Sequence, residues 1–132
     1  MKDEILRDYF DKLIPVDILY KDVEGSEAKT SYDVISVYID QIKDGSQYIV
    51  TKDHLLKLCN DALSGNLKMS HLTTIAFALV FSDYFAWNSD EDDVVETVIF
   101  DWDNPEINFP INFDNLKKWK TYLETGIYKL KA

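Results

Sequence analysis

The chain has 132 residues, of which 46% are apolar, so it lies near the commonest size of a single domain and can bury a proper core. Its 18 aromatic residues place it outside the range of disordered chains, although its formal net charge is −10. The longest apolar run, residues 75–81, is too short to cross a bilayer, and the acidic start of the chain does not resemble a signal peptide. We therefore expect one domain over residues 1–132, in a cytoplasmic protein.

Two amphipathic helices are predicted in the first third of the chain. Residues 2–14 place an apolar stripe on one helical face before Pro15 interrupts the pattern, and this stripe consists of Ile5, Leu6, Tyr9, Phe10 and Leu13. A polar stretch around Gly25 follows. Residues 31–43 then repeat the helical spacing and stop before Gly45, with an apolar face made of Val34, Ile35, Tyr38, Ile39 and Ile42.

The middle of the chain predicts two further helices. Thr51 is a good N-cap for a helix that ends near Gly65 and carries Cys59 on its apolar side. That position favours a buried thiol over a nucleophile. Ser70 can cap the next helix, which reaches Phe81 and is apolar almost all round, so we expect it at the centre of the core.

Residues 90–102 fit a helix better than a strand. Their β-branched residues suit a strand as well, and these are Val94, Val95, Thr97, Val98 and Ile99. Helical spacing nevertheless puts the apolar residues within one arc, whereas strand alternation would place Glu96 in the apolar row. A short strand over 94–102 is the alternative. With a last helix over 114–124, the predicted fold is an all-α or mainly α bundle of about six helices.

The negative charge is concentrated in one segment. Ten of the 24 acidic residues lie in residues 69–115, which contain no Lys or Arg, so the other 14 acids balance the 14 bases of the chain. A field of one sign interleaved with aromatic residues is typical of a surface that captures a basic partner. The predicted binding residues are Trp87, Asp90, Glu91, Asp92, Asp93, Glu96, Phe100 and Asp103, several of which share the outward face of the 90–102 helix.

There are two simpler interpretations of these acidic and aromatic residues. Phe100 could be covered by the connector over residues 105–110, and the acidic face could serve solubility alone. The missing compensating bases favour a binding role, because mixed charges would satisfy a solubility requirement without the cost of self-repulsion.

Other chemistries find less support in the sequence. The acidic runs supply oxygen ligands but lack the spacing of a calcium loop, so we expect neither a metal ion nor another cofactor. His54 and His71 belong to no catalytic spacing, and both are expected to face solvent at the starts of helices. The negative charge disfavours direct nucleic-acid binding. An enzyme is not expected, although a carboxylate-based metal-dependent enzyme stays open as an alternative.

The stretch NPEINFPINFDNLKKWKTYLETG, from Asn104 to Gly126, follows the acidic segment. In this arrangement the chain resembles small acidic bacterial immunity proteins of polymorphic toxin and contact-dependent growth inhibition systems. The resemblance implies a non-enzymatic protein that binds a cognate toxin, for which a basic nuclease is favoured, and blocks its active site or substrate path. That family shares no catalytic residues, so the resemblance assigns no site here. An adaptor that holds a basic segment without inhibiting its partner is the other alternative.

Overall fold

Six α-helices and two small sheets make up the computed structural model, which describes residues 1–29, 35–37, 39–87 and 93–130. The helices are α1 (Asp3–Phe10), α2 (Val16–Ser26), α3 (Lys52–Leu63), α4 (Met69–Phe81), α5 (Val94–Asp103) and α6 (Phe113–Thr125). The strands are β1 (Glu27–Lys29), β2 (Ile35–Val37), β3 (Tyr48–Ile49) and β4 (Phe85–Ala86). The predicted mainly α-helical class is confirmed. Within the described ranges, no helix combines the length and apolarity that crossing a bilayer requires.

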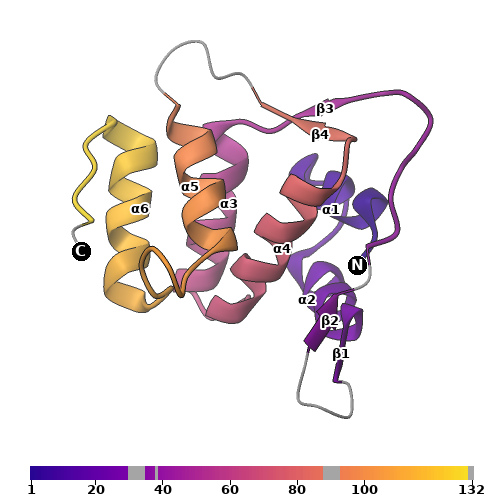
Figure 1. Cartoon of the computed structure of the whole chain (residues 1–132), viewed down its shortest axis with the longest axis horizontal. Helices are drawn as coiled ribbons and strands as arrows, with labels where there is room; N and C mark the ends of the chain where they lie inside the picture. The colour runs from indigo at the N-terminus through magenta and orange to yellow at the C-terminus, as the bar shows by residue number, and fades with distance from the viewer. Residues whose placement is uncertain (30–34, 38, 88–92, 131–132) are drawn as a thin grey trace.

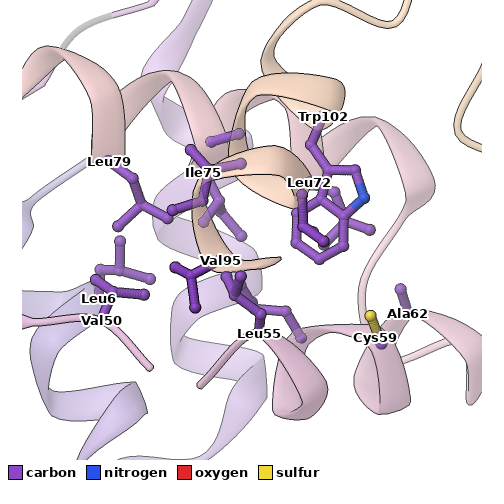
Figure 2. Close-up of a cluster of buried hydrophobic side chains, with 14 of the residues drawn as sticks. Leu6, Val50, Leu55, Cys59, Ala62, Leu72, Ile75, Leu79, Val95 and Trp102 are labelled. Carbon is purple, nitrogen blue, oxygen red and sulfur yellow. The ribbon is translucent and has the colours of Figure 1, made fainter. Parts of the chain in front are cut away.

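The core lies where α3, α4 and α5 meet. Figure 1 shows α6 at one end of the molecule and α1 and α2 at the other, with these three helices between them. Leu72 and Ile75 of α4 and Trp102 of α5 are fully buried, and Figure 2 shows them facing Leu55 and Cys59 of α3. Trp102 also meets Trp119 of α6 edge to face, with ring centroids 6.2 Å apart. As predicted, α4 is central, although Val80 and Phe81 at its end are 40% and 53% exposed.

Strands β3 and β4 form a short parallel sheet that links the start of α3 to the end of α4. Strand β3 precedes α3 and β4 follows α4, and Tyr48 lies opposite Phe85 in the register. The backbone N–H of Tyr48 donates to the carbonyl of Tyr84 at 2.7 Å, and that of Val50 donates to the carbonyl of Ala86 at 2.8 Å. Trp87 is the next residue after β4 and lies within the acidic segment, residues 69–115.

The first third of the chain differs from the prediction. Helix α2 includes the polar stretch around Gly25 and was not predicted; Val16, Leu19 and Val23 recur at helical spacing, and the last two are fully buried. The helix predicted over 31–43 is wrong where the structure describes it, since residues 35–37 form β2, which pairs antiparallel with β1. Residues 30–34 and 38 lie outside the described ranges.

The first helix is also shorter than predicted. It ends at Phe10, and Leu13, expected on its buried stripe, is 71% exposed. Lys12 adopts φ 62°, and the N–H groups of Lys12 and Leu13 turn back to the carbonyls of Tyr9 and Asp8 at 3.1 and 2.8 Å. These two bonds are those of a Schellman motif, which stops the helix before Pro15 can do so.

The remaining helices confirm the predictions closely. Helix α3 follows Thr51, α6 is capped by the side chain of Asn112, which accepts from the backbone N–H of Asn115, and α4 begins one residue before the expected cap Ser70. The β-branched segment is helix α5, not a strand. Its Val94, Val95, Val98, Ile99 and Trp102 side chains are all buried on one side, as helical periodicity required.

Candidate interaction surface

The outer side of α5 carries a stripe of acidic and aromatic residues. Because Val98, Ile99 and Trp102 face the core, the residues between them at spacings of three and four face outward. Glu96, Phe100 and Asp103 therefore follow one another along the helix surface, one turn apart. We call Trp87, Asp93, Glu96, Phe100 and Asp103 the acidic stripe.

Phe100 is the apolar centre of the acidic stripe. Its side chain is 40% exposed, and its ring meets that of Trp87 edge to face at 6.3 Å and 83°. At 40% exposure, Phe100 is not fully covered by the 105–110 connector or by any other described segment. A large aromatic side chain held by a second aromatic ring, with acids one turn away on either side, matches the anchors found at protein interfaces.

The described acids of the stripe are not neutralised by neighbouring bases. Asp93 is exposed, Glu96 and Asp103 are half-buried, and in the described part of the chain none of them forms an ion pair with Lys or Arg. Burial raises the pKa of the Asp103 carboxyl above its usual value. Asp93 adopts φ 54° where α5 begins. The other predicted binding residues, Asp90, Glu91 and Asp92, lie outside the described residues.

One acid of the segment has a structural role instead. Asp101 is only 8% exposed, and its Oδ2 accepts from the indole N–H of Trp119 at 3.0 Å and from the hydroxyl of Tyr128 at 2.5 Å. This carboxylate joins α5 to α6 and to the segment that follows it. It therefore contributes to packing and not to the surface that a partner could contact.

Both histidines lie at helix N-termini. The prediction that both face solvent is wrong, because His71 is buried and His54 is half-buried. His71 is 2% exposed; its Nδ1 accepts from the backbone N–H of Lys68 at 3.1 Å, and its Nε2 lies 2.8 Å from a carboxylate oxygen of Glu24. His54 is half-buried; its Nδ1 accepts from the backbone N–H of Thr51 at 3.0 Å. Each ring accepts from the backbone N–H of the N-cap residue, as Glu or Gln more often does in a capping box; before α4 the N-cap is Lys68, whose ammonium cannot accept the reciprocal bond.

A second polar cluster lies beside a cavity of about 550 Å³, which is lined by Lys57 and Asp61 of α3 and by Phe10 of α1. Tyr9 donates to Asp61, and Lys57 lies 3.7 Å from the same carboxylate and 4.1 Å from the Tyr9 ring centroid. Burial raises the pKa of Tyr9, so its phenol stays neutral. The polar groups of this cluster bind one another, which indicates that they join α1 to α3.

Metal-ligating side chains do not converge in the described ranges: no three of His, Cys, Asp or Glu there are placed to hold an ion. Cys59 is fully buried, as predicted, and burial raises the pKa of its thiol to about 12.

Comparisons of the chain with protein-family models, with curated proteins and with solved structures found no match. The resemblance to immunity proteins therefore stays a prediction, and the surface of α5 is interpreted through its own geometry and charge.

Proposed function

We propose that the protein is a non-enzymatic immunity protein that binds a basic toxin, with a nuclease as the favoured kind, through the acidic stripe. The proposal depends mainly on Phe100, whose side chain is partly exposed and whose ring contacts that of Trp87. Phe100 lies one helical turn from Glu96 and one from Asp103. A solubility feature needs acids on the surface but no aromatic side chain among them.

The two kinds of residue in the acidic stripe would have different kinetic roles. Unpaired carboxylates attract a basic partner over about a Debye length, so they raise the association rate at low salt. An aromatic anchor that becomes fully desolvated in the complex chiefly slows dissociation. Bound in this way, the protein would block the toxin by covering its basic substrate path.

The test is a pull-down from the native organism with this protein as bait, at low and at high salt. The captured partner is then expressed alone and together with the protein. We expect a basic partner that is toxic alone and silent in co-expression. A harmless partner that stays active in the complex would contradict immunity and support an adaptor, and no partner at either salt concentration would contradict a binding role.

The captured partner also allows the anchor to be tested. Phe100→Ala should raise the dissociation rate at least about 30-fold, since interface anchors contribute about 2 kcal/mol or more. Ile18→Ala on α2 is the matched control, because Ile18 is 39% exposed and Phe100 is 40% exposed. If both variants dissociate like the wild type, the interface lies elsewhere.

A further inference from the structure

An open groove lies at the end of α5, between the first turns of α4 and the connector to α6. Met69 and Thr73 of α4 form one wall, and Pro105, Pro110 and Ile111 of the connector form the other. The groove holds about 380 Å³, near the lower end of the range of ligand pockets, about 300–1,000 Å³. Its size suits one or two side chains, and its walls are mostly apolar.

The connector that forms one wall is held by its own hydrogen bonds. The N–H groups of Ile107 and Asn108 both donate to the carbonyl of Asn104, at 3.2 and 3.0 Å. The side-chain amide of Asn115 donates to the carbonyl of Pro110 at 2.9 Å. Together with the fixed φ of its two prolines, these bonds hold the wall in place, so a guest would lose little affinity to ordering of the connector.

The charged side chain in the lining of the groove, that of Glu106, is acidic. Every lining residue belongs to residues 69–115, which contain no Lys or Arg, and Glu106 is exposed on the wall itself. Asp103 ends α5 two residues before Pro105. The base that precedes the segment, Lys68, is held by Glu24 at 2.5 Å.

The base that follows the segment, Lys117, keeps its charge and contacts an aromatic ring. The ammonium of Lys117 lies 4.4 Å from the centroid of the Phe113 ring. The groove therefore combines an apolar interior with a rim that favours cations.

We propose that this groove binds an aliphatic side chain on a segment of the basic partner, with Lys or Arg on both sides of it. The aliphatic side chain fills the space between Thr73 and Pro110, and the flanking cations face Asp103 and Glu106. Because the connector begins where α5 ends, the groove extends the acidic stripe and supplies a second, apolar anchor. This inference rests on the proposed function, since it names the kind of segment that the partner must present.

The test uses two capped pentapeptides as probes, KRLRK and a control in which glycine replaces the leucine. Both carry the same charge, so their difference reports only the aliphatic side chain. We expect the leucine peptide to bind at least about tenfold more tightly, since its Leu side chain loses contact with water in the groove. In backbone NMR spectra it should shift the signals of Ser70, Thr73 and Ile111, which line or border the groove.

Thr73→Phe, which fills the groove, should abolish the advantage of the leucine peptide. Thr121→Phe is the matched control, because Thr121 is likewise half-buried on a helix, α6, and lies outside the groove. Thermal melts show whether each variant is folded, and Thr73→Leu replaces Thr73→Phe if that variant does not fold.

Three results would overturn the inference. Equal binding of both peptides would mean that charge alone is recognised, which leaves the proposed function intact. Binding of neither peptide in low salt contradicts the groove as a site, and the proposed function then depends on the co-expression test. If Thr73→Phe changes the sedimentation of the protein alone, a second copy of the chain occupies the groove.

Discussion

At the scale of single residues, His54 shows how a titratable group can stabilise the start of a helix. With Nδ1 accepting from the Thr51 N–H, a neutral His54 carries its proton on Nε2, which lies 3.2 Å from the Tyr48 hydroxyl. The Tyr48 hydroxyl donates in turn to Asp11 at 2.6 Å. A second proton on His54 would have to sit on Nδ1 and would break the cap of α3.

This arrangement predicts a pH dependence of stability. Burial lowers the pKa of His54 in the folded state, so its stabilisation is complete above the unfolded pKa of about 6.5 and is lost as the pH falls through the folded pKa. We expect the free energy of unfolding, measured with urea, to fall as the pH is lowered below about 6.5. His54→Gln keeps an acceptor for the cap but does not titrate, so its curve should be flatter. Parallel curves for the two proteins would contradict this role.

The contacts of Asp101 predict that substituting two acids of α5, Asp101 and Asp103, lowers the free energy of unfolding by different amounts. Asp101→Ala removes the acceptor of Trp119 and Tyr128 and leaves a buried indole N–H without a partner. It should lower the free energy of unfolding by about 1–3 kcal/mol. Asp103→Ala, the control at the half-buried end of α5, should cost far less because that carboxylate has no such bonds among the described residues. Urea titrations compare the two, and equal losses would contradict a structural role for Asp101.

At the scale of elements, the ends of α1 and α3 are the same motif built from different residues. After α3, Gly65 has φ 82°, and the N–H groups of Gly65 and Asn66 return to the carbonyls of Ala62 and Asp61. At the corresponding place after α1 stands Lys12, which has a Cβ and pays for its left-handed conformation.

Exchanging these residue types should therefore have opposite effects. Lys12→Gly should raise the free energy of unfolding by about 0.5–1 kcal/mol, the conformational cost less the greater chain entropy of glycine. Gly65→Ala should lower it by about 1 kcal/mol, and this is a backbone effect because an added Cβ would meet no atom within 4 Å. Denaturation midpoints measure both, and a loss of stability in Lys12→Gly would contradict the assignment.

The acidic stripe predicts a kinetic effect that belongs to α5 as an element. Asp93→Asn combined with Glu96→Gln should slow association with the captured partner by about 3- to 10-fold at low salt and leave dissociation nearly unchanged. Asp17→Asn combined with Glu124→Gln removes the same charge from exposed positions on α2 and α6. Stopped-flow measurements at two salt concentrations separate the pairs, and equal rates for both would show that only net charge matters.

At the scale of the whole molecule, Cys59 reports when the core opens. Its thiol lies fully buried on α3, and burial holds its pKa at about 12, so the reactive thiolate is scarce in the folded protein. A disulfide reagent at pH 8 should therefore label the native protein only as fast as the core opens, and at once in strong denaturant. Rapid labelling without denaturant would mean that α3 separates from α6 locally.

The fold was predictable wherever a helix buries a stripe of its own residues. The spacing in residues 94–102 identified α5 correctly despite its β-branched residues, and the same reasoning placed α3, α4 and α6. The spacing of Val16, Leu19 and Val23 held the same signal for α2, which the charged residues between them obscured. Residues 35–37 carried a misleading signal, because pairing with β1 outweighs helical spacing there.

Some features of the candidate surface were also predictable from the sequence, and others were not. The sequence by itself determined that the negative charge is concentrated in residues 69–115 and that Glu96, Phe100 and Asp103 share one side of a helix, since both are properties of neighbours along the chain. Only the tertiary structure decided that Trp87 backs Phe100, that Asp101 is buried by Trp119, and that His71 meets Glu24. These contacts join residues 13 to 47 positions apart, and no local periodicity records which distant side chains will meet.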